Sequence, residues 1–280
     1  MGSIAGGEWS RWVRSVKVAE AWGRQHLIGM AHEPLSAVGE IVRRHDPDRY
    51  FTSLFATSPR REALWALYAF NHELARAREA VREPFAALIR LQWWREVVEG
   101  ARRRHEVAGP LGEALDARLL DAGVLGAMID AREAETEPME TWPAFEDYLL
   151  GTAGGLMVAA AGALGEPEPE RLRQAGAAYG AMGVLRSVAA VARQGRCVLP
   201  GDALQEAGSS MEAVVAQGDA PTVVRERVRE LARSWLVPMP VVGRRVLPAV
   251  LPAVVAGVRV RGGTGAGRLA ILRAVVTGRL

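Results

Sequence analysis

The chain has 280 residues, of which 49% are hydrophobic and 24% are charged, and its formal net charge is +3 at pH 7. One hydrophobic core can fill a domain of this length, so we expect a single large domain. The only cysteine is Cys197, which excludes an intramolecular disulfide and a zinc site built from cysteines and is typical of a reducing cytoplasm. The five histidines lack ligand spacing, and no HExxH, GxSxG or glycine-rich phosphate loop occurs. We therefore expect no metal and no cofactor.

The first 29 residues place tryptophans among basic side chains, as in a short amphipathic helix. Such a segment suits targeting or anchoring at a membrane surface. The alternative that we favour is that translation starts at Met30, because Pro34 then opens the first helix of the domain. We expect residues 1–29 to pack poorly and residues 30–280 to form the domain.

The central stretch predicts two long helices. Ser58-Pro59 is a helix start signal, since serine is a preferred N-cap and proline is tolerated in the first helical turn. Apolar residues follow at steps of three and four as far as Leu74, which indicates a helix over about 59–80. Glu83-Pro84 opens the second helix.

Further helices are predicted over about 110–121 and 123–136. The second of these ends in an acidic run, Glu133, Glu135, Glu137 and Glu140, which we interpret as a solvated face because alternate helix residues do not face each other. Small residues at 151–155 and 159–163 allow either close helix packing or the wall of a cavity, and the sequence leaves both open.

The later part of the chain predicts helices over 170–193, about 221–236 and about 267–280. Between them lies the apolar stretch 246–258, which Pro248 and Pro252 interrupt and which is too short to span a bilayer. No stretch alternates as a strand would, so the predicted fold class is all-α.

The C-terminal end is strongly basic, because no acidic residue follows Glu230. It contains Arg233, Arg244, Arg245, Arg259, Arg261, Arg268, Arg273 and Arg279. Such an end prefers an anionic membrane surface or an acidic protein, although a merely solvated surface is equally compatible. No recognition motif supports nucleic acid, which we do not expect as a partner.

Several residues of the central stretch have the spacing of a known family. They are Tyr50, Phe55, Pro59, Arg61, Ala63, Leu67, Tyr68, Ala69 and Phe70. This pattern resembles the first conserved helix of the squalene/phytoene synthase family. The resemblance implies a single-domain, isoprenoid-synthase-like helical bundle in which the helices at 59–80 and 170–193 face each other across a central cavity.

By the same resemblance, catalytic members carry two aspartate-rich motifs that hold Mg²⁺ against prenyl diphosphates. The first motif falls here on Ala75, Arg76 and Glu79, and the second on Gly183, Ser187 and Val191. The frame around the second motif is retained as Leu185, Arg186, Arg193, Gly195, Arg196, Leu199 and Pro200. Since Mg²⁺ requires hard oxygen ligands, these replacements predict that the motifs are degenerate.

Three functions follow as hypotheses. The strings NHELARARE and RLQWWRE resemble the non-catalytic branch of the family, similar to a mitochondrial respiratory complex I assembly factor. This favours a non-catalytic assembly or interaction factor, cytoplasmic or peripheral to the inner membrane, with a membrane respiratory complex as its protein partner.

The second hypothesis is an isoprenoid, prenyl-diphosphate or lipid binder without turnover, whose candidate anion contacts are Tyr68, Arg76, Arg90, Arg186, Arg193 and Arg196. The third is an active head-to-head prenyl transferase, which would need Mg²⁺. The only other carboxylate pair that could supply ligands is Asp130 with Glu133, three residues apart on one helix.

Overall fold

The computed structural model describes residues 35–79, 84–237, 239, 241–263 and 267–277. The predicted N-terminal extension and the proposed start at Met30 lie outside the described residues. Within the described ranges every regular element is a helix, so the all-α prediction is confirmed.

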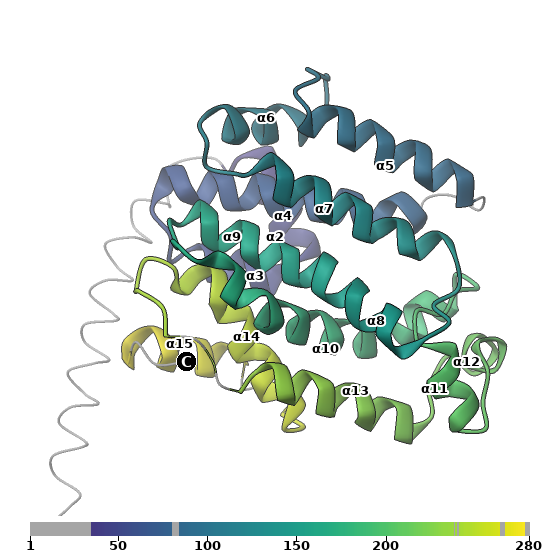
Figure 1. The fold of residues 1–280 in the computed structure, drawn as a ribbon. Helices are drawn as coiled ribbons and strands as arrows, with labels where there is room; N and C mark the ends of the chain where they lie inside the picture. The colour runs from purple at the N-terminus through teal and green to yellow at the C-terminus, as the bar shows by residue number, and fades with distance from the viewer. Residues whose placement is uncertain (1–34, 80–83, 238, 240, 264–266, 278–280) are drawn as a thin grey trace, which may run out of the picture.

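The helices follow one another with short connections, in an order that Figure 1 displays from purple to yellow. The first half comprises α2 (Ala37–His45), α3 (Pro47–Ser53), α4 (Ser58–Glu79), α5 (Pro84–Val98), α6 (Ala108–Asp116), α7 (Ala122–Glu133), the 3-10 turn η1 (Ala134–Thr136), α8 (Trp142–Leu149), the π-helical turn η2 (Leu150–Gly154) and α9 (Gly155–Ala163). The second half comprises the 3-10 turn η3 (Pro169–Leu172), α10 (Arg173–Ala192), α11 (Gly201–Glu206), α12 (Met211–Gln217), α13 (Thr222–Trp235), α14 (Leu247–Val260) and α15 (Gly267–Thr277).

The two predicted long helices of the central stretch form as expected. Helix α4 begins at Ser58 and α5 begins at Pro84, where the proline ring costs no internal hydrogen bond. Helix α4 is central, because it packs against α2, α5, α6 and α9, and its Leu64, Leu67 and Phe70 are fully buried. In Figure 1 the molecule is layered from α5 and α6 at the top, through α7, α9 and α10, to α13 at the bottom.

The segment predicted as broken by prolines is a continuous helix, α14. Pro248 lies in its first turn, where a missing N–H leaves no internal bond unmade, whereas Pro252 lies inside the helix and removes one. Burial of Val250, Leu251 and Val255 between neighbouring helices offsets that loss. The prediction of a broken segment was therefore wrong.

The small residues at 151–155 serve close packing. They form the π-helical turn η2, which lies directly against α10. A Cβ placed on Gly176 of α10 would lie 2.6 Å from the carbonyl oxygen of Ala153, so glycine is required there. The stretch 159–163 differs, because Ala159, Gly162 and Ala163 also line a pocket of about 480 Å³ with α6 and the start of α7.

One described helical stretch, Pro169–Ala192, is long and apolar enough to cross a bilayer by length and composition. More than half of its most apolar window is buried inside the bundle. Burial in the core around α10 therefore explains why this helical stretch is apolar.

Candidate functional site

A buried ion cluster lies where the end of α7 meets the segment that follows α10. Glu135, in the turn η1, accepts hydrogen bonds from Arg132 and from the Tyr148 hydroxyl, the latter at 2.7 Å. Its other carboxylate oxygen is 3.2 Å from Nη2 of Arg196. The Glu135 side chain is only 7% exposed. Arg132 also donates to Asn71 of α4 at 3.3 Å, so the cluster joins three parts of the chain.

The charges in this cluster stabilise one another. Burial alone would raise the pKa of the Glu135 carboxyl, but the positive charge of Arg132, the hydrogen bond from Tyr148 and the charge of Arg196 together lower it. The pKa of the Tyr148 hydroxyl is raised, first by burial and then by the neighbouring negative charge of Glu135. The carboxylate is therefore ionised in the folded protein at neutral pH.

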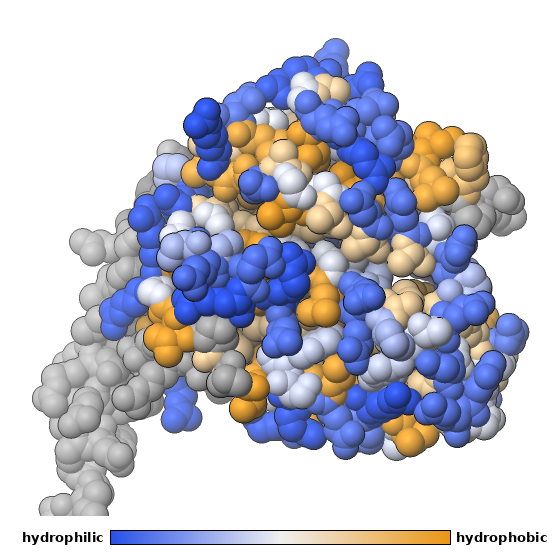
Figure 2. Space-filling view, in the orientation of Figure 1, coloured by the Kyte–Doolittle hydropathy of each residue, from blue (hydrophilic) through white to orange (hydrophobic). Residues whose placement is uncertain are grey.

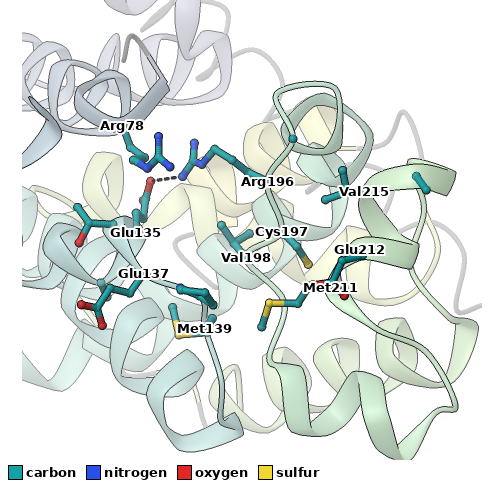
Figure 3. Close-up of a pocket in the computed structure, with 15 residues that line it drawn as sticks. Arg78, Glu135, Glu137, Met139, Arg196, Cys197, Val198, Met211, Glu212 and Val215 are labelled. Atoms are coloured by element: carbon teal, nitrogen blue, oxygen red, sulfur yellow. Dashed lines mark hydrogen bonds and ion pairs between the residues drawn. The ribbon is translucent and has the colours of Figure 1, made fainter. Parts of the chain in front are cut away.

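A pocket of about 400 Å³ opens beside the cluster (Figure 3). Arg78 of α4, Glu135 and Arg196 form its polar wall, and its apolar wall includes Met139 and Met211. Cys197 also lines the pocket, and burial raises the pKa of its thiol, as expected of a cysteine that packs as a small hydrophobic side chain. Glu137 and Glu212 line the pocket as well, so it combines apolar surface with charged groups of both signs.

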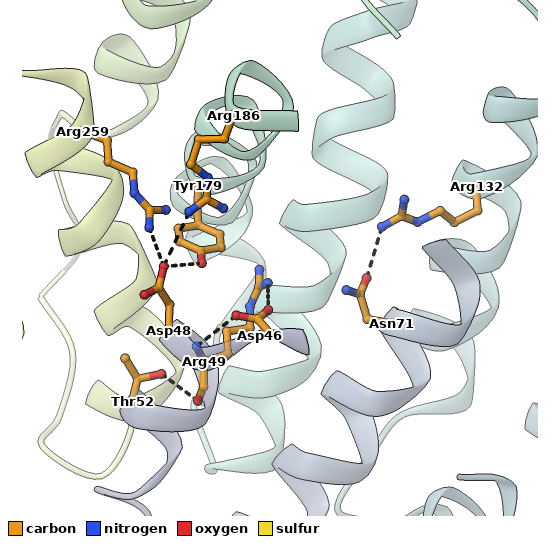
Figure 4. A network of polar contacts seen from close by, with 9 residues as sticks. All are labelled: Asp46, Asp48, Arg49, Thr52, Asn71, Arg132, Tyr179, Arg186 and Arg259. Carbon is orange, nitrogen blue, oxygen red and sulfur yellow. Dashed lines mark hydrogen bonds and ion pairs between the residues drawn. The ribbon is translucent and has the colours of Figure 1, made fainter. Parts of the chain in front are cut away.

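A second polar network joins α3, α10 and α14 around Asp48 (Figure 4). One carboxylate oxygen of Asp48 lies 2.5 Å from Nη2 of Arg259 and accepts a hydrogen bond from the Tyr179 hydroxyl at 3.1 Å. Arg186 approaches the same oxygen at 3.7 Å, although its side chain is 52% exposed. The Asp48 carboxylate therefore binds Tyr179 and Arg259, which lie 131 and 211 positions further along the chain.

Arg49 fills the space between the two predicted facing helices. Its guanidinium pairs with Asp46 at 2.7 Å and lies 5.7 Å from the ring centre of Tyr68 and 4.6 Å from that of Tyr179. Burial opposes the charge of Arg49, but Asp46 and the two tyrosines raise its pKa. Burial raises the pKa of Tyr179 to about 12. Because Tyr68 belongs to α4 and Tyr179 to α10, the predicted opposition of these helices is confirmed.

The Tyr68 hydroxyl lies inside this second network. Burial raises its pKa, and the oxygen has no hydrogen-bond partner among the residues that the structure describes. The tyrosine contributes its ring to Arg49 rather than a hydroxyl contact to a neighbouring side chain.

The positions aligned with the aspartate-rich motifs carry few donor oxygens. Ala75 is half-buried and apolar, and Arg76 pairs with Glu73 at 2.9 Å. The Ser187 hydroxyl donates to the carbonyl oxygen of Val184 at 3.0 Å, as helix serines commonly do. Gly183 and Val191 are half-buried, and the Glu79 side chain lies outside the described residues.

The candidate anion contacts do not converge on one site. Arg196 and Tyr68 are buried in the two separate clusters, and Arg90 and Arg193 are exposed. Arg76 and Arg186 are about half exposed and paired with carboxylates.

The carboxylate pair Asp130 and Glu133 is on the surface. Arg95 binds both, at 2.5 and 2.9 Å, and neither residue lines the pocket beside Glu135.

The sequence did not single out the residues on which both networks depend. Glu135 was assigned to a solvated face, which was wrong, and Asp48, Arg49 and Arg259 were not identified as a group. The available signal was Tyr148, a hydroxyl that a buried position requires to be paired. Among the residues that the structure describes, no three His, Cys, Asp or Glu side chains gather as metal ligands.

The two longest helices of this all-helical bundle, α4 and α10, place Tyr68 and Tyr179 on either side of Arg49. The model of the squalene/phytoene synthase family matches residues 42–266, so the chain belongs to that family. A solved dehydrosqualene synthase, crystallised with a ligand, has the same fold, with a TM-score of 0.68 and 14% identity over 91% of this chain and 98% of that one.

Relatives by sequence fall into two groups. Assembly factor 6 of NADH dehydrogenase (ubiquinone) complex I from Mus musculus is 28% identical over 202 residues, which cover 69% of this chain and 60% of that protein. Chloroplastic phytoene synthase from Narcissus pseudonarcissus is 29% identical over 202 residues, covering 63% and 45%. The chain spans 24% to 60% of the length of the mammalian assembly factors from human, mouse and cattle.

Proposed function

We propose that this chain is a non-catalytic interaction factor that acts in the assembly of respiratory complex I. The observation that carries the proposal is the buried cluster of Arg132, Glu135, Tyr148 and Arg196. Glu135 already pairs with Arg132 and Arg196, whose guanidinium groups a diphosphate would otherwise contact. This pairing supports a structural role for the two arginines.

The residues at the motif positions do not fit Mg²⁺. This ion requires several oxygen ligands in near-octahedral geometry, usually including carboxylates. Ala75 and Val191 have no donor atom, the Arg76 guanidinium would repel the ion, and the Ser187 hydroxyl is bonded to its own helix. No step that depends on a metal is therefore assigned to this chain.

The partner is suggested by the relatives named for complex I assembly. Such a role places the protein at the membrane that holds the respiratory complex, bound peripherally and not as a catalyst.

Deleting the gene from a host that has complex I should lower the amount of assembled complex and its NADH oxidation. The intact chain should restore both, and so should a variant with Arg76→Ala and Ser187→Ala, because no reaction at the motif positions is needed. Native gels of solubilised membranes measure the assembled complex. An unchanged level of complex I in the deletion strain would rule out the assembly role.

Arg78 and Arg196 line the pocket beside its apolar wall, which favours a second candidate function, a lipid or prenyl-diphosphate binder without turnover.

Purified protein mixed with farnesyl or geranylgeranyl diphosphate and Mg²⁺ should release no diphosphate above background. Calorimetry with the same ligands without Mg²⁺ then separates the candidates, since binding that is lost in Arg196→Gln supports the binder. Mg²⁺-dependent diphosphate release that is lost on changing Glu79 or Asp130 would instead establish the transferase.

A further inference from the structure

The connection between α13 and α14 exposes two large aliphatic side chains. Val237 is 73% exposed and Val241 is 87% exposed. Met239 and Val242 of the same connection pack against the core instead. Arg171 also donates to the carbonyl oxygen of Val241 at 2.9 Å. The valines are therefore held at the surface by an anchored backbone.

Arginines border these valines. Arg244 and Arg245 follow Val241 after two intervening residues and are exposed. Arg60 of α4 is not counted with them, because its guanidinium donates to the carbonyl oxygen of Ala163. The carboxylate bonded to Arg171 belongs to Glu166, whose side chain is 4% exposed, so it adds little negative charge to the surface. An anion bound beside the consecutive arginines Arg244 and Arg245 would relieve the repulsion between their charges.

The fold places the arginines of the basic C-terminal end in different environments. Arg259 is drawn inward to Asp48 and is 20% exposed, so it is not part of this surface, contrary to its inclusion in the predicted basic end. The side chains of Arg268 and Arg279 lie outside the described residues. Figure 2 shows hydrophobic surface at the left-hand end of α13, where the connection begins. The term docking loop is used here for four described residues of the connection, Val237, Val241, Arg244 and Arg245.

We propose that the docking loop binds the surface of an anionic lipid bilayer, with Val237 and Val241 entering the interface and Arg244 and Arg245 contacting phosphate groups. The docking loop offers the methyl groups of Val237 and Val241 and the guanidinium groups of Arg244 and Arg245. A bilayer interface satisfies both without requiring a surface of matching shape. A protein partner would be expected to meet aromatic anchors, and the exposed hydrophobic residues of this loop are aliphatic. The proposal does not depend on the assembly role, since a catalyst with this fold could dock in the same way.

The experiment is flotation of the full chain with vesicles of phosphatidylcholine alone or with about one third phosphatidylglycerol. The intact protein should float with the anionic vesicles at low salt and should dissociate as salt rises, because exposed charges are screened within about 10 Å at 0.1 M. Changing both Arg244 and Arg245 to Gln should weaken binding about thirtyfold, taking about 1 kcal/mol for each arginine near an anionic surface. Changing Val237 and Val241 to Ser should weaken it severalfold.

Matched controls lie elsewhere on the chain. Arg103 and Arg104 are consecutive exposed arginines, and Val223 is 62% exposed at the far end of α13. Changing the first two to Gln, or Val223 to Ser, should leave vesicle binding unchanged. Equal losses in the control and loop variants would overturn the proposal. Failure of the intact protein to float with anionic vesicles would also overturn the proposal. If the protein binds polyglutamate instead of vesicles, the docking loop binds an acidic protein.

Discussion

Replacing Glu135 with alanine should lower the free energy of unfolding by about 3–5 kcal/mol, because breaking a buried ion pair leaves the remaining charges uncompensated. Arg132 and Arg196 are 13% and 11% exposed, so water cannot replace the lost carboxylate efficiently. For a domain of this size the loss corresponds to roughly 6–20 °C in Tm. Thermal unfolding followed by circular dichroism measures it.

Glu137 supplies the control for this prediction. It lies two residues away in the same acidic run but is exposed, so Glu137→Ala should change stability by less than about 0.5 kcal/mol. Comparable losses in the two variants would mean that the cluster around Glu135 does not stabilise the fold.

The same carboxylate predicts an acid limit on stability. Its pKa is lowered in the folded state from an ordinary value of 4.5, so the unfolded chain takes up the proton first as the pH falls. The stabilisation by Glu135 is therefore complete above about pH 4.5 and is lost as the pH drops through the folded pKa. Glu135→Ala should remove this part of the acid dependence.

Replacing Asp48 with alanine should destabilise the protein by about 2–3 kcal/mol, since hydrogen bonds to a charged group contribute more than neutral ones. The effect comes mainly from Arg259 and Tyr179, because Arg186 is half exposed and its pairing is weakened by solvent. Urea unfolding at constant pH gives the value.

Asp219 is the matched control for Asp48. It also pairs with an arginine, Arg225, at 2.6 Å, but its side chain is 64% exposed. Asp219→Ala should therefore cost less than about 1 kcal/mol. A loss at Asp48 no larger than that at Asp219 would contradict the structural role of the second network.

The long helices were predictable because their signals are local. Ser58-Pro59 and Glu83-Pro84 mark helix starts whatever the rest of the chain does. Helix α14 was missed since its prolines are unfavourable locally, and only its burial between other helices reverses that preference. The short helices α11 and α12 lack the repeated apolar spacing that identifies longer ones.

The polar networks were harder to predict because charge partners depend on tertiary structure. Glu135 sits in an acidic run that is typical of a solvated face, and Arg196 lies 61 residues away. Nothing in the local pattern separates it from the exposed Glu137. The family resemblance located the two facing helices correctly, but it directed attention to Arg76, Arg90 and Arg193, which are exposed, and away from Arg49.

The bond between Asp48 and Arg259 sets a condition on how the protein is made. A ribosome adds about 5–20 residues per second, so the 211 residues between the partners take roughly 10–40 s to synthesise. During that interval α3 has no α14 to pack against, and the apolar surface that they later share is open to water or to chaperones. The apolar surface of α3 is therefore covered only after the last helices have been synthesised. A chain released before α14 would leave this surface exposed permanently.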